Sequence, residues 1–501
     1  GTVVKVVGGI KVFALYHPSY ILRVPGMLPK FEQHLRELQR IVRKEKGAEK
    51  MEVLDLSPKE AFQILVETDG LVAFDYETTG LNKANGLDHV RAVGFSTGQE
   101  TFVVNGDQNL VDVRKLMRWF LASDIPKAAF NSTFETYWSI MEYGVEPKDL
   151  VHDPQIMAYL LDENSSKDLE AVASKYLKAP AWGIEGRMLN KGWDFRTIPY
   201  QELVYYCGMD AYWTQCLSGE LDKYLQPEIP GRTFGLPIRV GCKAWHIFLN
   251  MARLCARLQV RGVKVDEVWA YRADRSYERG QLDLLEQMEK MPAIREYANL
   301  KENKNPKFEF NPGSGMQLRE IIVGKLGLRT EKKTAKGGAM SMDQSELEKI
   351  RDRHPFISTY LDWKSITTRR NNFTIKFPSQ CDEQGIIHPH YRVVGTVTGR
   401  LAASDPPVHT FPRPEEDEDT AQVAKIRGMV VSRFPGGKIC VNDYSQLELR
   451  LAASESGEEG MLEAFTKGVD LHGLTAARVF GKNYTKAQRS IGKTLNFAVI
   501  F

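Results

Sequence analysis

The stretch LVAFDYETTG, residues 71–80, runs from an apolar segment into a pair of carboxylates and then a polar turn. Asp75 and Glu77 are two residues apart, so on a strand both side chains point to the same face of the sheet. Two carboxylates at a strand end can bind a divalent metal, because hard cations prefer oxygen ligands. Such a pair also occurs as an ordinary salt-bridged strand end. Taken alone, the stretch predicts a strand but does not decide whether the two carboxylates bind a metal.

The segments around this strand predict an α/β domain. RAVGFSTGQETFVVNG, residues 91–106, predicts two further strands. Apolar residues then recur at helical spacing over residues 110–123, 131–143 and 153–162. Strands that alternate with helices are typical of an α/β fold. A stretch rich in proline and glycine around Pro230 predicts the end of this domain.

Two later segments add polar residues to the carboxylate pair. FNSTFE, residues 130–135, predicts Asn131 and Glu135 in the first turns of a helix. YCGMD, residues 206–210, predicts Tyr206 and Asp210 one helical turn apart on one face. Two metal ions about 4 Å apart, held by such carboxylates, can activate water and stabilise the leaving oxygen in phosphodiester hydrolysis.

The order and spacing of these segments resemble the three motifs of the DEDDy family of proofreading 3′–5′ exonucleases. The resemblance implies an RNase H-like domain in which the tyrosine orients the attacking water. It implies metal ligands at Asp75, Glu77, Glu135 and Asp210, with Tyr206 beside them and Asn131 on the DNA. The family normally has Asp where Glu135 stands, and a shift of about 1 Å can cost roughly a hundredfold in rate. The sequence therefore leaves two alternatives, an active exonuclease and a degenerate domain kept as a scaffold.

A second motif lies in KICVNDYSQLELRLAA, residues 438–453, which predicts a strand ending at Asp443, a turn and a helix start. DYSQLELR resembles motif A of the family A DNA polymerases, the polymerase I type. By that resemblance Asp443 binds both catalytic Mg²⁺ ions. Glu448 would be the steric gate against a ribose 2′-hydroxyl.

Residues 488–501, QRSIGKTLNFAVIF, carry Arg489, Lys493 and Phe497 at steps of four, hence on one helical face. Two cations one turn apart suit a triphosphate, and the ring can stack on base and sugar. An ordinary amphipathic basic helix has the same pattern. The helix resembles polymerase motif B, which implies nucleotide binding by these residues, with Phe501 where the family usually has Tyr. Two further segments resemble the same family. By that resemblance Arg400 contacts the primer in its minor groove, and His472 contacts the nucleotide phosphates.

The composition of the chain is compatible with its resemblance to these exonucleases and polymerases. The chain has 501 residues, 43% hydrophobic and 26% charged, with a net charge of +3. That balance excludes a disordered chain and a uniformly basic coat, but not a local basic groove. The six scattered cysteines predict a reducing, cytoplasmic setting, in the nucleoid or an infected host cell. No apolar run approaches the roughly 18 residues of a membrane span, so no membrane association is expected.

The fold expected from the resemblance is an α/β RNase H-like exonuclease domain, then a mostly helical thumb and an incomplete α+β palm and fingers of a right-hand polymerase. Its cofactor would be Mg²⁺ or Mn²⁺ in two-metal sites, and its partners primer–template DNA and dNTPs. The lysine- and arginine-rich stretch 301–376 would be the thumb, although such runs are often simply solvated surface. The expected divisions are residues 1–50, a remnant and linker; 51–228, the exonuclease; 229–385, the start of the palm and the thumb; and 386–501, motif A and partial fingers.

Both ends of the sequence suggest a piece of a larger product. The family needs a second metal-binding Asp in a His-Asp-Glu motif, which a second polypeptide or downstream segment would supply. We therefore expect a split, intein-interrupted or truncated polymerase that cannot polymerise alone, in a viral or bacterial setting. VFALYHPSYILR, residues 12–23, resembles the C-terminal end of family 4-like uracil-DNA glycosylases. A coincidental strand and turn explains it equally.

Two other functions stay open. A stand-alone 3′–5′ exonuclease of the RNase D type would explain the N-terminal motifs, but not DYSQLELR. A non-catalytic DNA-binding subunit would follow if Glu135 abolishes metal binding.

Overall fold

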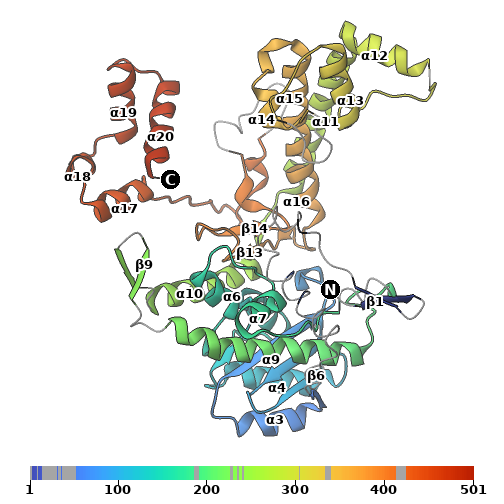
Figure 1. Cartoon of the computed structure of the whole chain (residues 1–501), viewed down its shortest axis with the longest axis vertical. Coiled ribbons are helices and arrows are strands. Elements are labelled where there is room, and N and C mark those ends of the chain that lie inside the picture. The colour runs from blue at the N-terminus through green and yellow to red at the C-terminus, as the bar shows by residue number, and fades with distance from the viewer. Residues whose placement is uncertain are drawn as a thin grey trace. The chain divides into compact units, whose positions relative to one another are not determined.

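The computed structural model divides into two compact units, residues 1–433 and 434–501 (Figure 1). The structure describes residues 52–184, 191–225, 242–303, 305–332, 340–412 and 425–500, together with short pieces before residue 36 and between residues 230 and 239. Near the N-terminus it describes the backbone of an antiparallel pair, β1 (Val3–Val7) and β2 (Ile10–Phe13). Most of the segment that resembles a glycosylase, and Phe501, lie outside the described residues.

A mixed six-stranded sheet forms the centre of the first unit, in the order β3-β6-β5-β4-β7-β8. Its strands are β3 (Leu54–Leu56), β4 (Val72–Thr78), β5 (Val90–Ser96), β6 (Thr101–Asn105), β7 (Lys127–Ala128) and β8 (Leu150–His152). The central strand β4 runs antiparallel to β5 and parallel to β7. The predicted strands and the α/β class of this part are therefore confirmed.

Helices cover this sheet (Figure 1). They are α3 (Pro58–Val66), α4 (Leu110–Ala122), α5 (Ser132–Trp138), α6 (Pro154–Leu161), α7 (Leu169–Leu177) and α9 (Tyr200–Leu225). The predicted helices over 110–123 and 153–162 are confirmed, and that over 131–143 is α5 followed by a π-helical turn, η3 (Ser139–Tyr143). Phe74 on β4 packs in one cluster with Phe120 of α4, whereas α9 packs against β4, β5 and β6.

The close approach of α9 to the sheet depends on glycine. A Cβ atom at Gly94 of β5 would lie 2.6 Å from the carbonyl oxygen of Cys207 and 3.0 Å from its Sγ. A Cβ at Gly208 would lie 2.3 Å from the Val53 side chain. Real Cβ atoms do not approach a backbone oxygen so closely, so any larger residue at position 94 must push α9 off the sheet.

The change Gly94→Ala is therefore expected to destabilise the exonuclease region by about 1–3 kcal/mol, the usual cost of overpacking. Thermal unfolding measures the effect. The matched control is Gly219→Ala in α9, the helix that packs against Gly94, where an added Cβ meets nothing within 4 Å. An equal loss of stability in both variants would contradict the packing argument.

The rest of the first unit is mostly helical. Its main elements are β9 (Pro230–Thr233), β10 (Leu236–Arg239), α10 (Cys242–Arg261), β11 (Val263–Lys264), α11 (Glu267–Lys290), α12 (Pro292–Glu302), α13 (Gly315–Arg319), η4 (Glu320–Lys325), α14 (Gln344–Glu348), α15 (Pro355–Arg369), η6 (Arg370–Ile375), α16 (Lys376–Ser379), β12 (Ile386–Ile387), β13 (His390–Arg392) and β14 (Ala402–Ser404). α11 packs along α15, as Figure 1 also shows. A separate apolar core, which includes Met288, Ile321 and Phe356, holds the tip of this region together.

Several cations of the predicted basic thumb are already ion-paired. Lys301 lies 2.8 Å from Glu320, and Arg370 lies 2.9 Å from Asp274 and 3.0 Å from Glu278. These cations therefore stabilise helix packing, and a role on the DNA backbone stays a prediction. Residues 333–339 of this stretch lie outside the described residues.

The second unit is helical in its described part. Its helices are α17 (Leu447–Ser456), α18 (Glu459–Thr466), α19 (Leu471–Phe480) and α20 (Lys486–Ile500). The strand predicted over 438–443 is wrong: these residues belong to no strand, and Val441 is 85% exposed. A strand needs a neighbour to pair its backbone groups. The described residues of this unit offer none.

No helix in the described part of the chain combines the length and the apolar character that a membrane crossing requires.

Candidate active site

Strand β4 presents two carboxylates to helix α9. The side chains of Phe74 and Tyr76 pack in the apolar cluster that holds α4 and α5, so Asp75 and Glu77 point to the opposite face. On that face Asp75 is paired in register with Gly94, against which α9 lies. Glu77 is buried and Asp75 is half-buried. The predicted common orientation of the two carboxylates is confirmed.

Cys207 of α9 is the third member of this cluster, and it was not among the residues predicted from the sequence. A carboxylate oxygen of Asp75, one of Glu77 and the Cys207 sulfur all lie within 4.8 Å of one another. The thiol lies 3.9 Å from Asp75 Oδ2, to which it donates. The sequence did carry a signal for Cys207: it lies three residues before Asp210, so a helix places the two side chains on the same face.

Glu135 of α5 brings a third carboxylate from another segment. Its side chain is 2% exposed, and its Oε2 has no hydrogen-bond partner. Burial raises its pKa well above the usual value, and the nearby charge of Asp75, together with Asp153 and Asp210, raises it further. Glu135 is therefore close to the carboxylates of β4 and α9, as predicted. A buried carboxylate oxygen without a donor fits a cation.

Asp153 holds α5 in this position. One of its oxygens accepts the backbone N–H of Ser132 at 2.7 Å and the other that of Asn131 at 3.2 Å. The same carboxylate caps α6 through the N–H of Gln155. Asn131 is the exposed N-terminal cap of α5, with φ of 64°. Asp153 thus ties the start of the Glu135 helix to the next helix.

We expect Asp153→Asn to lower nuclease activity about tenfold, since an amide nitrogen would face an N–H donor and displace the start of α5. The concentration of Mn²⁺ that gives half-maximal activity should rise as Glu135 moves. Asp168→Asn is the control, because Asp168 caps the neighbouring helix α7 through Ala171. If both variants lose stability but keep the Mn²⁺ midpoint, Asp153 does not position Glu135.

Helix α9 brings Asp210 and Tyr206 to the same region, one turn apart. Asp210 is 9% exposed, and the indole N–H of Trp182 donates to its Oδ1 at 2.5 Å. Tyr206 is half-buried and its ring lies 6.4 Å from that of Phe195. Trp182 was also missed, because a contact across 28 residues leaves no periodic signal. It fixes the orientation of the Asp210 carboxylate.

The electrostatics of this group favour cation binding. Burial raises the pKa of Asp75 to about 7, against the lowering effect of the Cys207 thiol. The charges of Asp75, Glu77 and Asp210 also raise the pKa of Cys207, after burial itself. Because four carboxylates cannot all be ionised cheaply in one buried place, a divalent ion would relieve both the burial cost and the repulsion. The residues present fit such an ion.

The second unit brings together the predicted nucleotide-binding residues of α19 and α20. Arg489 donates to both oxygens of Asp470, at 2.6 and 2.9 Å, and the Phe497 ring lies 5.8 Å from the His472 ring. Lys493 is exposed. Burial lowers the pKa of His472, and the charges of Arg489 and Lys493 lower it further. The predicted common face of α20 is confirmed.

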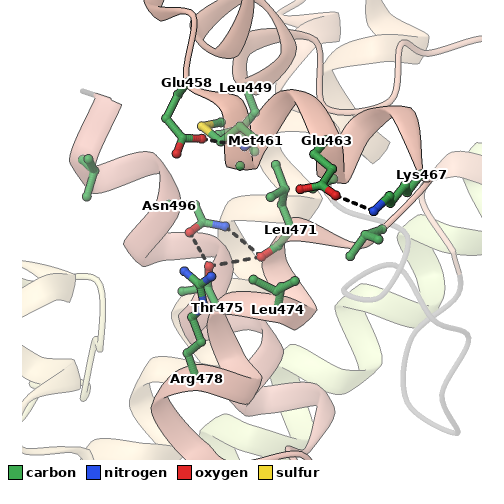
Figure 2. A pocket seen from close by; sticks show the side chains of 14 residues that line it. Leu449, Glu458, Met461, Glu463, Lys467, Leu471, Leu474, Thr475, Arg478 and Asn496 are labelled. Atoms are coloured by element: carbon green, nitrogen blue, oxygen red, sulfur yellow. Dashed lines mark hydrogen bonds and ion pairs between the residues drawn. The ribbon is translucent and has the colours of Figure 1, made fainter.

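A pocket of about 540 Å³ lies among α17, α18, α19 and α20 (Figure 2). Thr475 donates to Asn496 Oδ1 at 2.7 Å, and Asn496 donates to the Leu471 carbonyl at 3.3 Å. Leu474 and Val499 also line the pocket, whereas Arg489 and Lys493 do not. The pocket is therefore distinct from the cationic face of α20.

The remaining predicted residues belong to both units. Asp443 is exposed, and Glu448 lies in the first turn of α17. Arg400 is exposed and belongs to the first unit. Within its own unit, neither Asp443 nor Arg400 belongs to a described cluster of potential metal ligands.

Two known protein families match long stretches of this chain. Residues 53–226 match the family described as 3′–5′ exonuclease, and residues 283–501 match DNA polymerase family A. The chain therefore carries an exonuclease domain followed by a region of DNA polymerase family A. These matches do not show the glycosylase resemblance of residues 1–50.

Individual relatives are bacterial and viral polymerases. The chain is 27% identical over 453 residues to DNA polymerase I of Chloroflexus aurantiacus, covering 88% of this chain and 44% of the relative. It is 27% identical to DNA polymerase I of Pseudomonas aeruginosa, covering 90% and 48%, and 32% identical to the DNA polymerase of Bacillus phage SP01, covering 38% and 21%. The chain thus spans less than half the length of these relatives.

A solved structure has the same fold. It is the POL domain of Pol1 from M. smegmatis in complex with DNA primer-template and dNTP, with a TM-score of 0.62 and 20% identity, covering 89% of this chain and 71% of that one. At this identity the likeness shows the fold alone.

Proposed function

We propose that the first unit is a metal-dependent 3′–5′ exonuclease acting on the primer strand of DNA. The observation that carries the proposal is the buried Oε2 of Glu135, which has no partner; the carboxylates of Asp75 and Asp210 are close enough for their charges to raise the pKa of Glu135. The family match over residues 53–226 supports the reaction class. Mg²⁺ or Mn²⁺ is the proposed cofactor, held by Asp75, Glu77, Glu135 and Asp210.

Bound there, a divalent ion would supply a water of lowered pKa and stabilise the leaving oxygen. The residues of this chain orient the reactants. Trp182 fixes the Asp210 carboxylate, and Asp153 fixes the helix that carries Glu135. Tyr206, half-buried one turn before Asp210, is proposed to orient the attacking water through its hydroxyl. Asn131, exposed at the start of α5, is proposed to contact the DNA.

A nuclease assay on a 3′-recessed DNA primer with Mg²⁺ tests this function. We expect release of nucleotides by the wild type and none by Asp75→Ala. Failure of the wild type to release nucleotides with either Mg²⁺ or Mn²⁺ would leave the scaffold alternative.

We further propose that the chain takes part in template-directed DNA synthesis. Arg489, Lys493 and His472 would bind the dNTP phosphates, with Phe497 packed on the nucleotide and Phe501 close by in sequence. Asp443 would bind Mg²⁺, Glu448 would exclude ribose, and Arg400 would contact the primer. The match of residues 283–501 to family A supports this proposal.

Nucleotidyl transfer needs ligands that hold both ions, and one exposed aspartate cannot do so. Among the described residues, the one metal-binding cluster is that of Asp75. We therefore propose that a further segment or polypeptide with a His-Asp-Glu motif completes the polymerase. Primer extension by the 501-residue chain alone would contradict this.

A further inference from the structure

The exonuclease site contains a thiol that its hydrolytic reaction does not require. Cys207 has no role in activating water or in orienting DNA, yet its sulfur lies within 4.8 Å of ligand oxygens of Asp75 and Glu77. It is fully buried and reaches the site from helix α9. The backbone that carries Cys207 is held close to the sheet, because α9 packs directly on Gly94.

We infer that Asp75, Glu77 and Cys207 form a binding site for a thiophilic divalent cation such as Zn²⁺ or Cd²⁺, and that this ion inhibits the exonuclease. A second, independent observation points to a cation here. The Oε2 atom of Glu135 is buried and unpartnered, and Glu135 is close enough to Asp75 for their charges to interact. The inhibitory part of the inference rests on the proposed nuclease function.

Ligand chemistry sets the selectivity of this site. Thiolate favours Zn²⁺ and Cd²⁺, whereas Mg²⁺ takes oxygen ligands and gains little from sulfur. On binding, the S–H bond of Cys207 breaks, its proton passes to the solvent, and the sulfur electron pair forms the bond to the metal. No oxidant or reductant is involved.

Competition for ligands explains why this ion inhibits. Asp75 and Glu77 are two of the carboxylates proposed to hold the catalytic Mg²⁺, and both lie in the cluster with Cys207. An ion held by these two carboxylates and the Cys207 thiolate would occupy them and keep the catalytic Mg²⁺ out.

Cadmium titration tests the site without using enzyme activity. The chelator-treated full chain is titrated with CdCl₂, and the ultraviolet charge-transfer band of the cadmium–thiolate bond is measured. We expect a band that saturates near one equivalent in the wild type and in Cys255→Ala, which removes another fully buried thiol. The band should be lost in Cys207→Ala and in Cys207→Ser. An absent band in the wild type, or an unchanged band in both Cys207 variants, would overturn the inference.

Inhibition of the Mg²⁺-supported nuclease by Zn²⁺ supplies the second measurement. The Zn²⁺ concentration for half inhibition, relative to each variant's own activity, should rise at least about tenfold in Cys207→Ser. The Mg²⁺ midpoint should change less, which a purely structural role would not predict. Equal shifts for the two metals would overturn the inference. A wild type with the cadmium band but no nuclease activity would contradict the proposed function instead.

Discussion

Asp75→Asn is expected to lower nuclease activity at least about 10³-fold while raising the thermal stability of the metal-free protein. The loss follows because a carboxylate ligand supplies several kcal/mol to a metal-assisted reaction, and each 1.36 kcal/mol is tenfold in rate. The gain follows because Asn removes a half-buried charge that faces the carboxylates of Glu77 and Glu135. Function and stability oppose each other at this residue.

The gain in stability should depend on pH in a defined direction. The pKa of Asp75 is raised to about 7 in the folded protein, so its neutral form is favoured there. Its contribution to stability is therefore fully present below pH 4, the unfolded value, and is lost as pH rises through about 7. Because Asn resembles the neutral form, the stability gain of Asp75→Asn over the wild type should be small at pH 4 and largest at pH 8. We expect a Tm increase of about 3–6 °C at pH 8.

Thermal unfolding in a chelating buffer measures this effect. Asp69→Asn is the control, because Asp69 is an exposed carboxylate outside the site. Added Mn²⁺ should raise the Tm of the wild type at pH 8 and have a smaller effect on Asp75→Asn. A variant that is less stable than the wild type at both pH values would show that the contacts of the Asp75 carboxylate stabilise the fold more than its buried charge destabilises it.

The parts of the fold predicted from sequence are those with a local signal. The period-two pattern around Asp75 and the helical spacing of Arg489 and Phe497 each lie within one element. Cys207, Asp153 and Trp182 were missed as site residues because their roles depend on tertiary contacts, across 132 residues for the thiol and Asp75. The wrong strand over 438–443 has the same cause, since a strand's pairing is not encoded in its own residues.

Glu135→Asp decides how the departure from the family motif should be understood. If the domain were a degenerate scaffold, restoring the usual Asp would raise nuclease activity. We expect the opposite, a fall of about a hundredfold. The start of α5 is fixed by Asp153, so the backbone cannot move toward β4 to compensate for the lost methylene. The shortened carboxylate would stop about 1 Å short of the place that Glu135 occupies now.

Single-turnover nuclease rates, measured over a range of Mn²⁺ concentrations, separate these outcomes. Glu135→Gln is the matched control: it keeps the length and removes the charge. Both variants should be slow, but Glu135→Gln should raise the Tm at pH 8. At this pH the unfolded state ionises Glu135, whereas burial and the Asp75 charge oppose its ionisation in the folded state. Glu135→Asp keeps the charge and leaves a cavity of about one methylene, so it should lower the Tm. Faster cleavage by Glu135→Asp would mean that the glutamate is a defect and that the site was built for the shorter side chain.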